Sequence, residues 1–172
     1  VNLVTLDFET YYSKEFSLSK LPTEEYIRSP EFETIGVGVK INKEPSRWLI
    51  GKEVNKLHAM VDWSSSMLLA HNTRFDGAIL NWRLGIKPAV YLDTLCMARA
   101  IHGVDVGGSL KFLAELYGIG AKGTEINDAL GKRLKDFTVT EINQYGEYCK
   151  NDVELTYQLF NILLPKVSKK EL

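Results

Sequence analysis

The sequence predicts a single α/β domain built on a mixed five-stranded sheet with helices on both faces. Residues 2–10 and 34–41 alternate apolar with polar or small residues, and a turn at 42–45 connects the second stretch to a third at 46–50. Beyond residue 50 the apolar period lengthens, and helical stretches alternate with short apolar ones. Three antiparallel strands followed by strand–helix alternation predict a mixed sheet.

The remaining elements follow from the same periodicities and from their end signals. Val54, Leu57 and Val61 recur at helical spacing, and Ser109 and Thr140 are suited to cap the later helices. In chain order we expect a helix over 54–61, a strand at 67–70, a helix over 73–84 ended by Gly85, a strand at 90–92, and helices near 94–102, at 109–117 and over 141–164.

Two long segments interrupt this pattern. Residues 11–33 are too long and too polar for a turn between two strands, although 22–28 favour a short helix with Pro22 near its first turn. Residues 118–137 contain four glycines and form a second irregular stretch. Long segments of this kind in compact domains often form the walls of functional clefts. Cleft walls and solvated connectors are equally compatible with both sequences.

Composition and charge narrow the class of protein. The chain has 172 residues, of which 45% are hydrophobic and 25% charged, so residues 1–172 fit one globular domain. No apolar run reaches the roughly 20 residues that span a bilayer, and we expect no membrane association. Cys96 and Cys149 lack metal-ligand spacing and indicate reduced structural thiols in a cytoplasmic protein.

The net charge of −1 argues against a protein that holds long nucleic acid by charge alone. A nucleic-acid enzyme of this charge would hold a short end in a cleft, with metal ions supplying positive charge. The sequence begins at Val1, and Pro165 ends a helical stretch before a polar tail. We expect a domain excised from a longer protein; a naturally short protein that has lost its methionine is the alternative.

Two carboxylates, Asp7 and Glu9, lie two residues apart on the first predicted strand, so both project from the same face. Leu6 and Phe8 point the other way, into a core. Carboxylates held this close repel each other unless a cation lies between them, and hard oxygen ligands suit Mg²⁺ or Mn²⁺. Among 22 acidic residues, the pair alone is more typical of a solvated strand end.

Two further elements carry candidate ligands. Asp76 falls early in a helix that follows a buried strand, where the helix dipole stabilises an anion. Tyr148 and Asp152 are four residues apart and share one face of the last helix, where a phenol and a carboxylate would converge on one water. Taken singly, Asp76 is typical of a first-turn acidic residue, and Tyr148 of a partly buried tyrosine beside a surface aspartate. The combination is more specific than any one element.

Together these elements resemble the DEDD (DnaQ-like) 3′→5′ exonuclease family, which has an RNase H-like fold. Residues 6–10 (Leu-Asp-Phe-Glu-Thr) resemble its first motif, 72–76 (Asn-x-x-Phe-Asp) its second and 148–152 (Tyr-x-x-x-Asp) its third. The third motif resembles the tyrosine subclass, because Glu147 stands where the other subclass has histidine, five residues before Asp152.

A narrower resemblance is to the proofreading domain of bacteriophage-type family A DNA polymerases. Residues 11–12 (Tyr-Tyr), 25–27 (Glu-Tyr-Ile) and 36–39 (Gly-Val-Gly-Val) carry it, after Asp7. The resemblance implies a single-stranded DNA 3′ end as substrate, and a DNA polymerase domain, covalently linked after Leu172 or associated. For a bacteriophage protein it implies the host-cell cytoplasm.

The family resemblance also implies hydrolysis of a phosphodiester with two divalent ions, Mg²⁺ or Mn²⁺. By resemblance, Asp7 bridges both ions, Glu9 and Asp152 complete the first site, and Asp76 holds the second. Tyr148 orients the attacking water, because a phenol with a pKa near 10 is a poor base at neutral pH.

The terminal nucleotides would meet a second set of residues. Phe8 is expected to contribute through its backbone beside the metals, and Phe75 serves core packing with equal reason. Basic residues at 132–135 are a further contact for phosphates, although a solvated basic run is the more typical interpretation. The resemblance implies these substrate-binding residues: Phe8, Thr10, Asn72 and Phe75.

Two other functions are compatible with the same motifs. An RNA 3′ exonuclease of the RNase D type would share the metal chemistry and differ in its contacts with the 2′-hydroxyl. Residues 11–39 resemble the polymerase type and argue against it. A catalytically inactive nucleic-acid-binding module is the third interpretation, and the presence of all four carboxylates and the tyrosine counts against it.

Overall fold

The computed structural model describes residues 1–121 and 129–167. Its centre is a five-stranded sheet in the order β3-β2-β1-β4-β5, which confirms the α/β fold class. The first three strands pair antiparallel, and the last two extend the opposite edge in parallel. The strands are β1 (Leu3–Thr10), β2 (Thr34–Ile41), β3 (Arg47–Ile50), β4 (Met67–Ala70) and β5 (Val90–Asp93).

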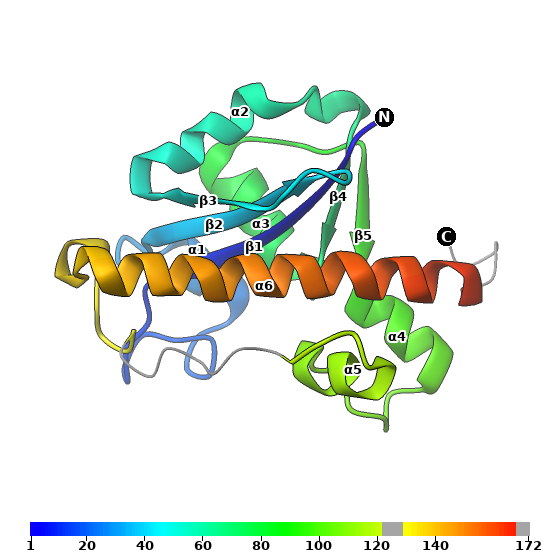
Figure 1. Ribbon diagram of the computed structural model, residues 1–172. Coiled ribbons are helices and arrows are strands. Elements are labelled where there is room, and N and C mark those ends of the chain that lie inside the picture. The colour runs from blue at the N-terminus through cyan, green and yellow to red at the C-terminus, as the bar shows by residue number, and fades with distance from the viewer. Residues whose placement is uncertain (122–128, 168–172) are drawn as a thin grey trace.

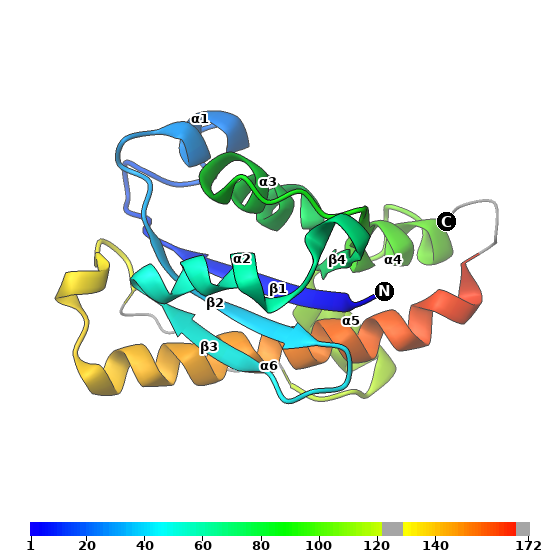
Figure 2. The same cartoon turned by 90° about the horizontal axis from the view of Figure 1, so that it is seen from above.

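Helices cover both faces of the sheet, as expected (Figures 1 and 2). The long helix α6 crosses one face together with α4 and α5, and α1, α2 and α3 lie on the other. No helix among the described residues is long and apolar enough to cross a membrane. The helices are α1 (Thr23–Arg28), α2 (Leu57–Met60), α3 (Thr73–Leu84), α4 (Thr94–His102), α5 (Leu110–Tyr117) and α6 (Val139–Leu163).

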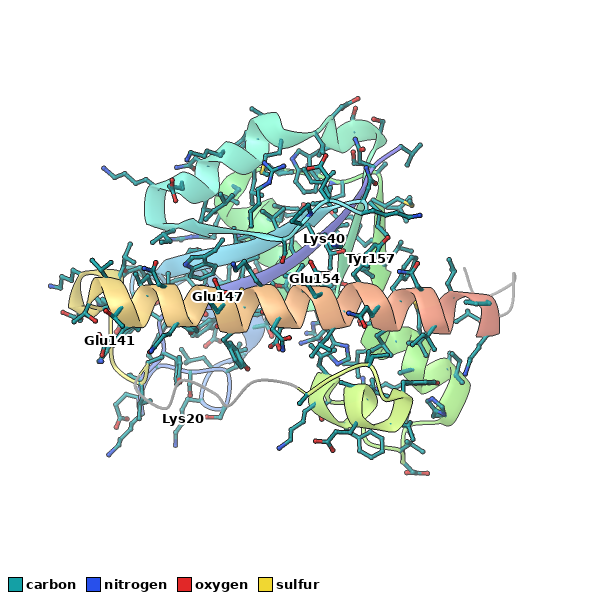
Figure 3. The ribbon with its side chains drawn as sticks, in the orientation of Figure 1. Lys20, Lys40, Glu141, Glu147, Glu154 and Tyr157 are labelled. Carbon is teal, nitrogen blue, oxygen red and sulfur yellow. The ribbon has the colours of Figure 1, made fainter. Side chains whose placement is uncertain are left out.

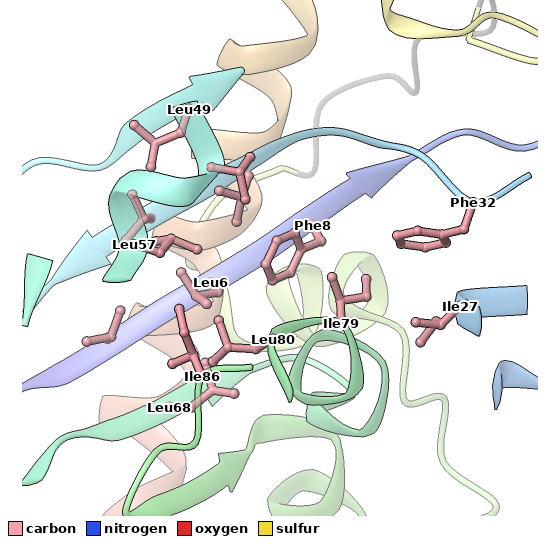
Figure 4. Close-up of a cluster of buried hydrophobic side chains, with 14 of the residues drawn as sticks. Leu6, Phe8, Ile27, Phe32, Leu49, Leu57, Leu68, Ile79, Leu80 and Ile86 are labelled. Carbon is pink, nitrogen blue, oxygen red and sulfur yellow. The ribbon is translucent and has the colours of Figure 1, made fainter. Parts of the chain in front are cut away.

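The central strand β1 divides its side chains between the two layers. Leu6 and Phe8 are buried in the core formed with α3, where Ile79 and Leu80 are also fully enclosed (Figure 4). Because side chains alternate along a strand, the acidic positions 7 and 9 face the opposite layer, which α6 covers. The predicted alternation of β1 is therefore confirmed, and it directs both carboxylates toward α6.

Two of the predicted helices differ from the sequence expectation. Residues 54–61 are not one α-helix: a 3₁₀-helix, Gly51–Lys56, precedes the single turn of α2. The last helix begins at Val139, and its N-cap is Thr138, so the assignment of Thr140 was wrong. The physical reason is a capping box, in which the hydroxyl of Thr138 accepts from the Glu141 N–H and the Glu141 carboxylate accepts from the Thr138 N–H.

Replacing Thr138 with alanine is expected to destabilise the protein by about 1 kcal/mol, because the first turn of α6 loses its side-chain acceptor. Thr140→Ala is the matched control. Thr140 is exposed within the helix, where alanine has the better intrinsic propensity, so no loss is expected. Urea unfolding of both variants checks the assignment, which is wrong if Thr140→Ala is the more destabilised.

A glycine in β2 allows α6 to lie close to the sheet. A methyl group at Gly38 would lie 2.8 Å from Cγ2 of Val153 and 2.9 Å from Sγ of Cys149. Gly38 is paired with Asp7 in the register of β1 and β2. This close approach of α6 therefore lies beside the first predicted ligand.

An ion pair holds α6 further along the same strand. Lys40 is buried, and its Nζ lies 3.0 Å from a carboxylate oxygen of Glu154 and 5.0 Å from the ring centre of Tyr157 (Figure 3). Its third contact is the backbone carbonyl of Glu44, at 2.8 Å. A buried ammonium needs such partners, so these contacts favour one register of the helix on the sheet.

Gly38→Ala is expected to lower the free energy of unfolding by about 1–3 kcal/mol, the usual cost of overpacking a closely packed contact. Urea denaturation measures the loss. Gly107→Ala is the control, because its added methyl would meet only the partly exposed ring of Phe112, which can move aside. Equal stability of Gly38→Ala and the unmodified protein would show that the contact between α6 and β2 yields easily.

Candidate active site

A cavity of about 510 Å³ lies between the end of β1, the face of α6 and the segment before β2. All the residues predicted for the site line it except Asn72 and Asp76. The predicted site residues that line the cavity are Asp7, Phe8, Glu9, Thr10, Phe75, Tyr148 and Asp152.

Strand β1 supplies two of the carboxylates. Asp7 and Glu9 are half-buried, and one carboxylate oxygen of each lies within 4.8 Å of the other and of Sγ of Cys149. This spacing follows from the two-residue repeat of a strand, which places both side chains on the side of α6. The pair is therefore not a solvated strand end.

Helix α6 supplies the third carboxylate and the tyrosine. Tyr148 and Asp152 stand one turn apart and face the same cavity. Asp152 is only 4% exposed, which rules out the alternative of a surface aspartate. By contrast, Glu147 is 76% exposed at its side chain and pairs with Lys150 at 2.7 Å, so the position typical of the histidine subclass points away from the site.

The fourth carboxylate, Asp76, lies behind the cavity in the first turn of α3. It is 3% exposed, and its Oδ1 accepts a hydrogen bond of 2.9 Å from the backbone N–H of Phe8, which lies between Asp7 and Glu9 on β1. Burial, and next the negative charge of Asp7, raise the pKa of the Asp76 carboxyl well above its ordinary value. The three motifs thus converge, as the sequence predicted.

Asn72 takes a different position from the other substrate-binding candidates. It is the N-cap of α3 in the left-handed conformation, with φ 72° and ψ 55°, and its backbone N–H donates to Asp93 at 3.0 Å. Asp93 also accepts from Thr73 and from Leu95, so one carboxylate holds the starts of α3 and α4 together. Sequence reasoning missed Asp93, although an aspartate just before a helix is a known N-cap signal.

Residues 11–33, before β2, form a wall of the cavity. Of the two alternatives for this segment, a cleft wall and a solvated connector, the structure therefore favours the cleft wall. Ser17, Ser19 and Tyr26 line the cavity, and α1 confirms the expected short helix. The ring of Phe16 stacks on Tyr26 at 4.6 Å between centroids, and the Tyr26 hydroxyl lies 2.8 Å from Oγ1 of Thr10. An aromatic stack therefore gives this polar segment a fixed path.

The second irregular stretch is described at 118–121 and 129–137, and the expectations for 122–128 lie outside the described residues. Within the described part, Ala129 lines the cavity. Lys132 lies 2.8 Å from Glu141, and Arg133 lies 3.0 Å from Glu33 and stacks over the ring of Tyr11. These two basic residues contact carboxylates of the chain itself.

Two residues of α6 in the site were not predicted. Tyr145 lines the cavity, and its side chain is hydrogen-bonded to Glu9. Cys149, predicted as a structural thiol, is buried and lies beside Asp7. The signal was present in the spacing, because positions 145, 148, 149 and 152 follow the i, i+3, i+4, i+7 repeat of a single helical face.

The donor set suits a hard divalent cation. Asp7, Glu9 and Asp152 line one cavity, with Asp76 enclosed behind them. Oxygen ligands of this kind are preferred by Mg²⁺ and Mn²⁺. A bound cation would also offset the repulsion between Asp7 and Asp76, one cause of the raised pKa of the Asp76 carboxyl. The residues present therefore fit a divalent metal.

Solved structures with the same fold include several nucleases. Brucella melitensis NrnC with bound Mg²⁺ is 16% identical, with a TM-score of 0.64 over 95% of this chain and 72% of that chain. Trypanosoma brucei RNase D in complex with the RNA U12 is 17% identical, with a TM-score of 0.69 over 98% of this chain and 57% of that chain. The catalytic core of RRP6 from Trypanosoma brucei is 14% identical, with a TM-score of 0.59 over 94% and 41%.

These likenesses confirm the RNase H-like fold. No curated protein sequence matches the chain. Residues 31–168 match the family model described as 3'-5' exonuclease, which includes the second and third motifs. The first motif lies before the matched residues, and the sheet brings it to the other two. The chain belongs to the 3′–5′ exonuclease family.

Proposed function

We propose that the chain is a 3′→5′ exodeoxyribonuclease that hydrolyses the terminal phosphodiester of single-stranded or frayed DNA and releases nucleoside 5′-monophosphates. The observation that carries the proposal is the convergence of Asp7, Glu9 and Asp152 on one cavity, with Asp76 directly behind. Loss of any of these carboxylates would have favoured an inactive binding module instead.

The four carboxylates would hold two divalent ions, Mg²⁺ or Mn²⁺. Asp7, Glu9 and Asp152 would hold one ion, and Asp76 would help Asp7 to hold the other. When bound, such ions lower the pKa of a coordinated water toward 7 and offset the charge of the phosphate. Tyr148 faces the same cavity one turn from Asp152 and positions the attacking water. A phenol is a poor base at neutral pH, so positioning is the role assigned to it.

The remaining lining residues hold the 3′ end. A cavity of about 510 Å³ is of the size that encloses a small ligand, and a base-paired end would be excluded from it. Phe75 lines the cavity and also packs against the core, with its ring centre 6.2 Å from that of Tyr26. Both of its expected roles are thus compatible. A base stacked on it would gain about 1–3 kcal/mol. Thr10 and the Phe8 backbone are assigned to the terminal nucleotides. Asn72 does not line the cavity and is assigned to them by the family resemblance alone.

Residues 11–39 support DNA as the substrate, since they resemble the proofreading domain of a polymerase. In this proposal residues 1–172 form one exonuclease domain that acts with a DNA polymerase domain, linked or associated. An RNA 3′ exonuclease is the second candidate, favoured by the likeness to RNase D in complex with RNA. The two candidates share their metal chemistry and differ only in the sugar that the cavity accepts.

The deciding experiment uses DNA and RNA strands of one sequence, labelled at the 5′ end, with Mg²⁺, Mn²⁺ or chelator. We expect stepwise shortening of the DNA from its 3′ end, complete inhibition by chelator, and slower cleavage of the RNA. RNA cleaved as fast as DNA would overturn the DNA assignment. An absence of cleavage of either strand with both metals would identify an inactive module.

Tyr148→Phe is expected to lower kcat about tenfold. This is less than the roughly 100- to 10,000-fold loss typical of a group that transfers a proton, because the phenylalanine ring still fills the cavity wall. Single-turnover cleavage of single-stranded DNA measures the change. A loss above a thousandfold would assign proton transfer, not positioning, to the phenol.

A further inference from the structure

We infer that Tyr145 and Cys149 form a positioning pair on α6 that holds the carboxylates of Glu9 and Asp7 in the geometry needed to bind a divalent cation. The inference rests on the proposed function, because it assigns a task toward the same metal site. Neither residue belongs to the three motifs from which the site was predicted.

Tyr145 is fixed against Glu9 by its surroundings. Its side chain is 5% exposed, lines the cavity and is hydrogen-bonded to the Glu9 side chain. Its ring packs between Trp48 and Phe137, with centroid distances of 6.1 Å and 5.7 Å. A phenol with an ordinary pKa near 10 carries its proton at neutral pH, so it donates a hydrogen bond to the Glu9 carboxylate.

The indole of Trp48 in turn packs directly against the backbone at two glycines. A methyl group at Gly146 would lie 2.4 Å from Cδ1 of Trp48, and one at Gly36 would lie 2.4 Å from its Cη2. The indole thus fills the space between β2 and α6 and leaves little room for the ring of Tyr145 to move. A phenol whose ring is packed in this way has a fixed direction for its hydroxyl group.

Cys149 contacts Asp7 on β1, as Tyr145 contacts Glu9. The thiol is fully buried, and its Sγ lies 3.2 Å from the backbone oxygen of Asp7 and 3.5 Å from its Oδ2. The neutral thiol is a weak donor directed at the strand that carries both ligands.

The two contacts repeat because the spacings of helix and strand match. Residues four apart on a helix are separated by about 6 Å along its axis, and residues two apart on a strand by about 6.6 Å. Tyr145 and Cys149 therefore meet positions 9 and 7 in antiparallel order. Gly38 permits the close approach, and the pair of Lys40 with Glu154 fixes the register.

Such support has a measurable effect on metal binding. Asp7 and Glu9 repel each other in the absence of a cation, and carboxylates that rotate apart must be ordered when the ion binds. Groups that orient ligands typically contribute 10–100-fold to metal affinity or activity. Tyr145→Phe is the sharp probe, because it removes the hydroxyl and keeps the ring between Trp48 and Phe137.

The experiment measures Mn²⁺ binding by isothermal titration calorimetry, and thermal unfolding in chelator, on the full chain. Tyr145→Phe is expected to weaken Mn²⁺ binding about tenfold with little change of Tm in chelator. Cys149→Ala is expected to weaken it less, and Cys149→Ser, which keeps a donor, to restore most of the loss. Tyr157→Phe on α6 and Cys96→Ala on α4 are the matched controls, both outside the cavity lining.

Unchanged Mn²⁺ affinity in Tyr145→Phe would overturn the inference, whatever its Tm, and would reduce the pair to packing. If the unmodified protein cleaves DNA and binds Mn²⁺ while both variants bind it equally well, only the positioning pair fails. If the unmodified protein neither binds Mn²⁺ nor cleaves nucleic acid, the proposed function fails and the inference with it. Loss of affinity in Tyr145→Phe without loss in Tyr157→Phe supports the pair.

Discussion

Asp7→Asn is expected to lower kcat/KM for single-stranded DNA by on the order of a thousandfold or more, which corresponds to about 4 kcal/mol of transition-state stabilisation. Asparagine keeps the size of the side chain and removes the charge. Asp7 lies at the centre of the cluster, with Glu9 and Cys149 beside it and Asp76 close enough to feel its charge.

The assay is cleavage of a 5′-labelled strand with Mn²⁺, and circular dichroism checks that the fold is retained. Asp105→Asn serves as control, because Asp105 is exposed in the turn after α4 and does not line the cavity. The site assignment is refuted if Asp7→Asn cleaves at the normal rate. A parallel loss in Asp105→Asn would show instead that the assay responds to net charge.

The sheet and the ligand positions were largely predictable, because each depends on short-range rules. Alternation in residues 2–10 predicts both the burial of Leu6 and Phe8 and the common face of Asp7 and Glu9. The N-cap of α6 was also encoded locally, since Thr138 and Glu141 have capping-box spacing. Thr140 was predicted as the N-cap because it lies nearest the expected start of the helix. Thr138 is the N-cap because it has Glu141 three residues later as its partner.

What the sequence did not reveal depends on contacts between distant segments. Tyr145 shows helical spacing with Tyr148, yet a tyrosine on an apolar face is usually a core residue, and only the neighbouring β1 gives it Glu9 as partner. The path of residues 11–33 depends on the stacking of Phe16 on Tyr26, which no periodicity expresses. Such features arise from packing, which overrides local patterns.

Asp76→Asn is expected to separate stability from activity. Activity should fall by on the order of a hundredfold, because one ion loses a charged ligand. In chelator the same variant should be more stable than the unmodified protein at pH 7–8. Asp76 is buried beside Asp7 without a cation in that state, and the asparagine oxygen can still accept the hydrogen bond from Phe8.

The sign of the pH dependence follows from the raised pKa. The folded protein keeps the Asp76 proton at a pH at which the unfolded chain has lost it, so this group stabilises fully below the ordinary carboxyl pKa of about 3.9. Its contribution is lost as the pH rises through the folded value. Urea unfolding in chelator should therefore show stability that declines with rising pH, less steeply in Asp76→Asn.

Mn²⁺ should reverse the order of the two proteins, because a cation that binds only the folded state stabilises it more the more tightly it binds, and Asp76→Asn is expected to bind it more weakly. The unmodified protein would then be the less stable of the two in chelator and the more stable with metal. A variant that is less stable than the unmodified protein in chelator at pH 8 would contradict this account. Asp76 would in that case act through its bond to Phe8, and the repulsion from Asp7 would not govern stability.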